Sequence, residues 1–430
     1  MKKIYKALLI CAFGALIVAC SKDNNDNKLY TPSPKEQWSK TMKGNGEELG
    51  AYPDLYSNYW EYTYQIDQHS DKIICLKGEF PYCRYFSLSL YDDETGSAIG
   101  GIDDVDILPD KGSENPFTKT VTGKNYFTIY IVPENTDQKI IDKLNTNNVR
   151  TVKNGVKRVA MCVRHYLGTT SDGKEADEYG GVELPAISAL DIKTLKAVEV
   201  PEHVVSNITK AVSQVFTQKS DENQTVPFFL APVSRYYPNN STAYLYARTH
   251  IKEDEVLKFS FIPAPVPTKP EEYATAVTRY WSVCLGSAAD TRSYFSLCDN
   301  NALYSPNKKS AFIVCLKKNS KLDLIKEKVN QMNSNGELVN LFVWDSEKMN
   351  IDNKALGEVV VIMYRNILPN SSWEHSIANM WPTAYKDATG EPIDHVTNPE
   401  KQLAHKALKE YGPFGEKIST EEFLALSKIE

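Results

Sequence analysis

Short segments in which apolar and polar residues alternate recur along most of the chain. In the segment from Arg84 to Tyr91, one face would hold Arg84, Phe86, Leu88 and Leu90, and the other Tyr85, Ser87, Ser89 and Tyr91. Successive side chains of a β-strand point to opposite faces of a sheet, so this alternation predicts sheets with one buried face. The segments are rich in Val, Ile, Tyr, Phe and Thr and are separated by Gly, Pro, Asn or Asp clusters, which favours a mainly β fold.

Five of these segments occur twice, in the same order. The paired segments begin at Tyr59 and Ala243, Ile73 and Val256, Arg84 and Arg279, Tyr126 and Ala311, and Arg158 and Val359, and their separations are 184, 183, 195, 185 and 201 residues. Nearly constant separations indicate an internal duplication on the scale of a domain. A chain of such strands closes most naturally as a sandwich or jelly roll, so two copies predict two tandem jelly-roll-like β-sandwiches.

Helical spacing of apolar residues appears in two other places. The stretch that begins at Pro201 predicts a helix between the sandwiches. Beyond the second sandwich, Asn398 could cap a helix that Gly412 ends, and Ser419 and Glu422 have the spacing of a capping box. We therefore expect a linking helix and a helical C-terminal tail.

The N-terminus has the layout of a bacterial lipoprotein signal. Three lysines lie within the first six residues, and an apolar run from Ala7 to Ala19 follows, which is too short to span a bilayer. The run ends in Leu-Ile-Val-Ala-Cys, so we predict that Cys20 becomes lipidated and membrane-bound after cleavage. A plain secretory signal with a chance cysteine is the alternative. By resemblance to known sorting rules, Ser21 favours the outer membrane, facing the periplasm or the cell surface.

The length of 430 residues also favours more than one core. The predicted organisation is a signal peptide at 1–19, a polar tether at 20–35, a first sandwich at 36–200, a linking helix at 201–225, a second sandwich at 226–385 and a helical tail at 386–430. The net charge of −6 gives no basic surface for nucleic acid, so we expect no nucleic-acid partner.

Two stretches carry a family resemblance. The segment "GEFPYCRYFSLSLYDDETGSAIGGIDDVDILPDKGSENPF" and, later, "RYWSVC" with "YRNILPNSSWEHSIANM" resemble an uncharacterised family of secreted bacterial proteins. The layout is also similar to jelly-roll-like domains of unknown function. The resemblance covers roughly residues 55 to 385 and implies a fold, but no reaction and no catalytic residues.

Cysteines and acidic residues suggest two kinds of site. Cys284 and Cys298 lie at either end of an expected hairpin and could form a disulfide in an oxidising compartment; the alternative is that they are small buried hydrophobic residues. The acidic loop with Asp104, Asp106 and Asp110 offers hard oxygen ligands that suit calcium. Its spacing is not that of an EF-hand, and a solvated loop that caps one end of a sandwich is the alternative.

Four arginines occupy duplicated positions, Arg84 with Arg279 and Arg164 with Arg365. A buried guanidinium needs a carboxylate or carbonyl groups. One interpretation is an Arg–Asp pair inside each half, with Asp92 or Asp104 serving the first half and Asp299 the second. The other is a pocket for an anion or a sugar at each sandwich mouth. The ligand-binding candidates are Arg84, Tyr91, Asp92, Arg164, Arg279, Trp281 and Arg365.

No known catalytic motif is present, and the seven histidines are scattered, so we assign no catalytic residue, metal or cofactor. The leading hypothesis is a lipid-anchored cell-envelope protein that binds a glycan, a small ligand or an envelope partner. One alternative is a hydrolase-type enzyme that acts on an envelope or polymeric substrate from a cleft between the sandwiches, with Asp92, Asp104 and Asp106 as acid and base. Another is a structural or assembly lipoprotein, docked through its tail.

Overall fold

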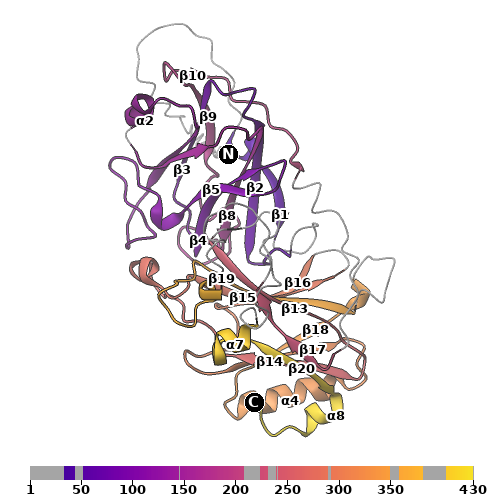
Figure 1. Ribbon diagram of the computed structural model, residues 1–430. Coiled ribbons are helices and arrows are strands. Elements are labelled where there is room, and N and C mark those ends of the chain that lie inside the picture. Colours follow the sequence, from indigo (N-terminus) through magenta and orange to yellow (C-terminus); the bar gives the residue numbers. More distant parts are fainter. Residues whose placement is uncertain are drawn as a thin grey trace, which may run out of the picture. The chain divides into compact units, whose positions relative to one another are not determined.

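The computed structural model describes residues 33–43, 52–144, 146–207, 223–230, 239, 241–288, 292–348, 358–380 and 403–429. Within these ranges the chain is mainly β, with four five-stranded sheets (Figure 1). Each of two apolar cores draws residues from two sheets, so the sheets form two sandwich-like pairs. We call residues 33–207 the first half and residues 223–429 the second half.

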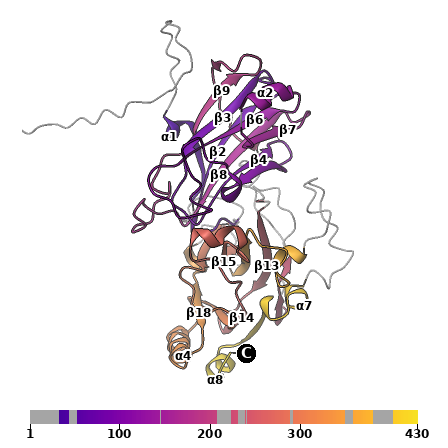
Figure 2. The ribbon, with the colours of Figure 1, turned by 90° about the vertical axis from the view of Figure 1, so that its left-hand side faces the viewer.

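The first half holds one sandwich. One sheet has the order β1 (Ser39–Lys43), β2 (Ser57–Gln65), β8 (Arg158–Tyr166), β4 (Tyr85–Asp92) and β5 (Ala98–Asp103). The other has the order β10 (Ala197–Val198), β9 (Ala186–Asp191), β3 (Lys72–Glu79), β6 (Tyr126–Pro133) and β7 (Val149–Val152). Helix α2 (Gln138–Leu144) connects β6 to β7, which run parallel (Figure 2). The remaining short helices are α1 (Pro34–Gln37) and η1 (Asp104–Asp106).

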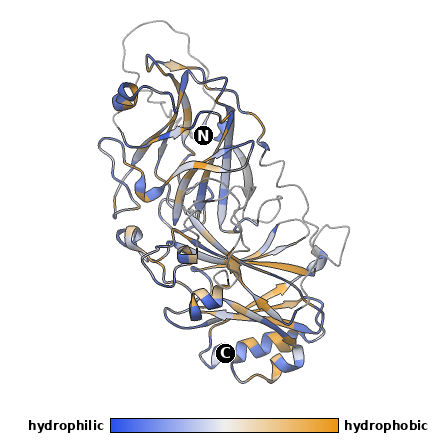
Figure 3. Cartoon of the chain, viewed as in Figure 1, coloured by the Kyte–Doolittle hydropathy of each residue, from blue (hydrophilic) through white to orange (hydrophobic). Residues whose placement is uncertain are grey.

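The second half repeats this arrangement. One sheet has the order β12 (Phe229–Leu230), β13 (Thr242–His250), β19 (Val359–Ile367), β15 (Tyr280–Ser287) and β16 (Ser293–Cys298). The other has the order β11 (Thr225–Pro227), β20 (Phe414–Ser419), β14 (Glu255–Phe261), β17 (Ser310–Leu316) and β18 (Val339–Trp344). Helix α4 (Leu322–Ser334) connects the parallel strands β17 and β18 and buries Ile325, Val329 and Met332 on its apolar face (Figure 3). The described part of this half also contains the short helices η2 (Pro270–Thr275), η3 (Ser346–Lys348), η4 (Ile377–Met380), α7 (Ala404–Ala407), η6 (Lys409–Tyr411) and α8 (Thr420–Ala425).

The matching strand orders confirm the predicted duplication. Pairing also refines its alignment: Ser57 and Tyr85 both lie opposite Tyr166, whereas Thr242 and Tyr280 both lie opposite Ile367. Ser57 therefore corresponds to Thr242. The match predicted for this strand, Tyr59 with Ala243, differs from this alignment by one residue. Leu167 and Leu368, which follow the equivalent strands β8 and β19, share a left-handed backbone with φ of 49° and 50°. Each half contains a parallel strand pair, which the antiparallel jelly roll does not.

Strand β4 is buried on both faces, although its alternation predicts one. Phe86, Leu88 and Leu90 lie in the sandwich core, whereas Tyr85 and Tyr91 lie in a separate cluster. That cluster contains residues of both halves, namely Tyr59, Tyr85, Tyr91, Ala160, Cys162, Tyr166, Tyr280, Cys298 and Ile367. We call it the junction. Contact with the second half, which the alternation of one strand cannot report, buries the outer face of β4.

The tail predicted to be helical at 386–430 is helical only in part where the structure describes it, since short helices alternate with a strand. Residues 386–402, including Asn398, lie outside the described ranges, and residues 414–419 form strand β20 between β14 and β11. Gly412 follows the short helix η6, and Ser419 and Glu422 form the predicted capping box at the start of α8. The segment therefore completes the second sandwich, as β9 completes the first.

The linking helix predicted at 201–225 is corrected where the structure describes it. Pro201 to Ser206 are irregular, Asn207 is helical, Thr225 begins strand β11, and residues 208–222 lie outside the described ranges. Val204 donates its backbone N–H to the carbonyl of Thr63, which lies on β2. This segment runs extended beside the first sandwich because the strand offers its backbone as a partner.

The predicted disulfide does not form in the structure. Cys284 lies opposite Ser296, and Cys298 lies opposite Ser282, so the two thiols occupy different rungs of the β15–β16 ladder. Both are buried free cysteines. The signal peptide, Cys20 and most of the tether fall outside the described residues, and no described helix has the length and apolarity needed to cross a bilayer.

Candidate functional site

A pocket of about 950 Å³ lies at one end of the first sandwich. Its lining comes from four segments of the first half, within residues 55–58, 79–84, 116–125 and 167–178, and from Pro270, Tyr273 and Asn300 of the second half. A volume of this size suits a small-molecule ligand rather than a single water or ion.

Glycines allow the chain to fold tightly around this pocket. Gly168 begins the connection from β8 to β9, and a Cβ atom there would lie 2.2 Å from the carbonyl oxygen of Asp177. Gly180, later in the same connection, has a left-handed φ of 68°, and its carbonyl accepts the backbone N–H of Tyr82. Only glycine fits both close contacts without strain. The connection is therefore held against the Tyr82 segment.

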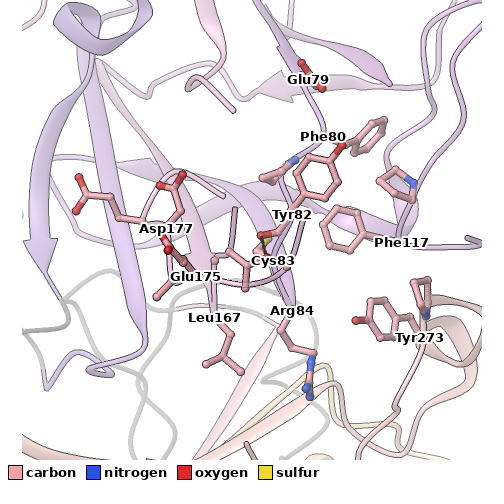
Figure 4. Close-up of a pocket in the computed structure, with 18 of the residues that line it drawn as sticks. Glu79, Phe80, Tyr82, Cys83, Arg84, Phe117, Leu167, Glu175, Asp177 and Tyr273 are labelled. Carbon is pink, nitrogen blue, oxygen red and sulfur yellow. Dashed lines mark hydrogen bonds between the residues drawn. The ribbon is translucent and has the colours of Figure 1, made fainter. Parts of the chain in front are cut away.

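Aromatic residues form one side of the pocket (Figure 4). Phe80 and Phe117 are largely buried, with ring centroids 6.3 Å apart, and support that side from the core. Tyr82 and Tyr273 are partly exposed, and the ring of Tyr273 lies 6.4 Å from that of Phe117. Two partly exposed tyrosines therefore line this side of the pocket.

Acidic residues lie on the other side (Figure 4). Asp177 accepts the backbone N–H groups of Tyr179 and Gly181, so its carboxylate stabilises the local turn. Glu175 is exposed at the rim. Figure 4 shows Cys83 and Arg84 between the acidic and aromatic sides. The pocket thus combines ring faces with charged and hydrogen-bonding groups.

At the base of the pocket, the equivalent arginines form ion pairs across the junction rather than within each half. Arg84 of the first half donates to Asp299 of the second at 2.6 Å, and Arg279 of the second donates to Asp104 of the first at 3.1 Å. Both aspartates follow the arginine of their own half by 20 residues, so the two pairs are equivalent and exchanged. The within-half pairing predicted for Arg84 and Arg279 is wrong, because each arginine reaches over the junction.

Hydrogen bonds at the junction repeat the exchange. Tyr280 donates to Asp54 at 2.7 Å, and Asn239 donates to the equivalent tyrosine, Tyr85, at 3.5 Å. Asp54 and Asn239 hold equivalent turns, since each accepts a backbone N–H two residues later. Such reciprocal contacts are those of a two-fold symmetric interface. The halves are therefore related as the subunits of a symmetric dimer would be.

Burial changes the titration of the junction carboxylates. It raises the pKa of Asp104 to about 6, against the opposing effects of the Arg279 charge and of the Phe86 backbone N–H. It also raises the pKa of Asp299, with Arg84 opposing. Each effect reflects the cost of a carboxylate charge away from water, which the neighbouring guanidinium offsets in part.

Among the predicted ligand-binding residues, only Arg84 lines the pocket. Arg164 and Arg365 are buried at the junction, where Arg164 donates to Ser89 and Tyr91, and Arg365 donates to the backbone carbonyl of Tyr52 at 2.7 Å. Tyr91 is fully buried there, and Trp281 is fully buried in the second core. Asp92 accepts the backbone N–H of Glu94 in the turn after β4. These positions are structural in the described part of the chain.

The predicted calcium ligands are dispersed. Asp104 is buried in its ion pair, Asp106 is exposed, and Asp110 accepts a hydrogen bond from Thr128 at 3.0 Å. Across the described ranges no three acidic, histidine or cysteine side chains come together as metal ligands would. Asp92, the remaining carboxylate of the hydrolase hypothesis, accepts a backbone N–H in the turn after β4.

Comparison with known proteins finds similarity to solved structures. No protein-family model matches the chain, and no curated protein matches it. Among solved structures, it is similar to an uncharacterised protein from Burkholderia cenocepacia, with 10% identity, a TM-score of 0.46, and coverage of 91% of this chain and 83% of that one. A protein from Vibrio parahaemolyticus shows 9% identity, a TM-score of 0.38, and coverage of 74% and 86%. At identities this low, only this chain's own residues can indicate a function.

Sequence analysis missed most of the pocket. Of its candidate ligand-binding residues, only Arg84 is among those that line the pocket. The lining residue Tyr273 lies in a connection of 18 residues between β14 and β15, whereas the equivalent connection between β3 and β4 has five. This difference in length between otherwise matched halves is the signal that could have located it.

Proposed function

We propose that this protein is a lipid-anchored cell-envelope protein that binds a carbohydrate in the pocket of its first half. The observation that carries the proposal is the pocket itself, in which two partly exposed tyrosines, Tyr82 and Tyr273, lie across from polar and acidic groups. A sugar ring has an apolar face that stacks on an aromatic ring and hydroxyl groups that need hydrogen-bond partners. Both requirements have residues to meet them here.

The anchor in this proposal is Cys20. The apolar run before it and the polar stretch after it favour lipidation and attachment to the outer membrane. A binding protein held at the envelope through a lipid meets its ligand outside the cytoplasm. Polysaccharides at the cell surface and in the periplasm are therefore the proposed source of the ligand.

Removal of one stacking ring tests the proposal. Tyr82→Ala, in protein that lacks residues 1–20, should weaken binding of a tetrasaccharide about tenfold, because a stacked aromatic contributes on the order of 1 kcal/mol. Tyr126→Ala is a matched control, since Tyr126 is 39% exposed on β6 and does not line the pocket. Isothermal titration with cellotetraose, xylotetraose, mannotetraose and tetragalacturonate measures the effect. Absence of binding to all four by the unaltered protein would refute the carbohydrate proposal.

A further inference from the structure

The two equivalent arginines have become different in their surroundings. Arg279 is fully buried: its Nη1 contacts Asp104 and the carbonyl of Arg84, and the ring of Tyr273 lies 4.0 Å from its guanidinium carbon. Arg84 keeps the equivalent ion pair, but 19% of its side chain is exposed, and it lines the pocket. Of the two equivalent arginines, Arg279 is therefore covered and Arg84 faces a cavity.

The length of a connection explains the difference. The connection that carries Tyr273 places its ring over Arg279. The equivalent connection in the first half, residues 80–84, is short and places no ring within such a distance of the Arg84 guanidinium in the described structure. As a result, space remains above Arg84, and the pocket occupies it.

Arg84 retains donors for a ligand. Among the described residues, its guanidinium has one hydrogen-bond partner, Asp299, which takes Nη1. The remaining N–H groups form a planar fork of fixed geometry, which suits two neighbouring acceptor oxygens better than a single one. The ion pair with Asp299 holds the guanidinium in place before a ligand arrives.

We infer that Arg84 orients the bound carbohydrate by donating to two adjacent hydroxyl oxygens, and that the ligand is a neutral sugar rather than an acidic one. This inference rests on the proposed carbohydrate-binding function. The lining contains Glu79, Glu175, Asp177 and Glu178 against Arg84, Lys119 and Lys174, and Asp299 already neutralises Arg84. A second carboxylate brought by the ligand would add to this negative excess, whereas hydroxyl groups would not.

The test replaces the planar fork and keeps the charge. Arg84→Lys should retain the ion pair with Asp299 and the thermal unfolding midpoint, but weaken binding of the neutral tetrasaccharides about tenfold, because an ammonium cannot hold two acceptors in one plane. Arg158→Lys is the matched control. Arg158 is 18% exposed and pairs with Asp93 at 2.9 Å, but does not line the pocket. Its affinity should equal that of the unaltered protein.

The outcomes separate the inference from the function on which it rests. Loss of affinity in Arg84→Lys but not in Arg158→Lys, with tetragalacturonate bound at least about tenfold more weakly than a neutral tetrasaccharide, supports the inference. Equal losses in both variants, full retention of affinity in Arg84→Lys, or preference for tetragalacturonate would overturn it. If Tyr82→Ala weakens binding while Arg84→Lys does not, the carbohydrate function stands and the role of Arg84 falls.

Discussion

The exchanged ion pairs predict which side chains are energetically coupled. Arg279→Met and Asp104→Asn each break a pair in which both side chains are 0% exposed. Removing one partner of a buried ion pair typically costs about 3–5 kcal/mol, because the other charge is left buried and uncompensated. We expect Arg279→Met to lose free energy of unfolding in that range, and the change in the double variant to be smaller than the sum of the two single changes.

The size of the coupling follows from geometry. Two unit charges 3.1 Å apart attract with about 5 kcal/mol at an effective dielectric constant near 20. Desolvation and the remaining polar contacts reduce the net value, so we expect a coupling free energy of about 2–3 kcal/mol between Arg279 and Asp104. The Arg84–Asp299 pair should give about 1 kcal/mol, since water reaches 19% of the Arg84 side chain and weakens the attraction.

Double-mutant cycles measured by urea unfolding provide the assay. Tryptophan fluorescence and circular dichroism should report coincident transitions, which is the condition for extracting one free energy. The within-half combinations, Arg84 with Asp104 and Arg279 with Asp299, are the built-in controls and should couple by well under 1 kcal/mol. Stronger coupling within the halves than across them would refute the exchange.

Three further predictions concern other parts of the molecule. Because the pKa of Asp104 is raised to about 6, the folded state holds the Asp104 proton more tightly than the unfolded state does. The stabilisation of the fold by protonated Asp104 is therefore fully present below about pH 4 and is lost as the pH rises to about 6. This loss is on the order of 3 kcal/mol, visible as a pH-dependent difference in urea midpoints between the unaltered protein and Asp104→Asn. Cys20→Ser should prevent incorporation of radiolabelled palmitate and release the protein from the membrane fraction; continued labelling would exclude Cys20 as the acylated residue. Gly168→Ala should lower the thermal midpoint, since its Cβ would lie 2.2 Å from a carbonyl oxygen, whereas Gly173→Ala, with open space around it but a left-handed φ of 71°, should cost only about 1 kcal/mol.

The strands were predictable because their pattern is local. Alternation in β4 and the matching motifs of β15 place these strands in equivalent sheets, as the structure confirms. What alternation cannot report is a second covering layer, and Tyr85 and Tyr91 are buried by residues distant in sequence. The burial of both faces of one strand therefore required the structure.

Strand β20 was missed for a related reason. Its sequence, Phe414 to Ser419, contains three charged or polar positions and a glycine, and it follows a stretch with helical spacing. The strand forms because β14 and β11 offer backbone partners on both sides. Tertiary pairing of this kind outweighs local preference.

The site was the least predictable part. Equivalent arginines could be recognised from the duplication, but not the half in which each finds its carboxylate. The sequence made Arg84, which lines the pocket, a candidate, but it gave no reason to select the lining residues Tyr82 and Tyr273. A cavity arises from the relative lengths of connections and from contacts between halves, neither of which leaves a periodic signal in a single sequence.

The exchanged aspartates also bear on how such a chain could arise. A single ancestral half with both the arginine and the aspartate would be self-complementary, so that two copies could associate through the same contacts. Joining the copies in one polypeptide makes their association independent of protein concentration. It also allows the two surfaces to differ. In this chain an insertion covers Arg279 in one copy, whereas the equivalent Arg84 keeps a side exposed to solvent.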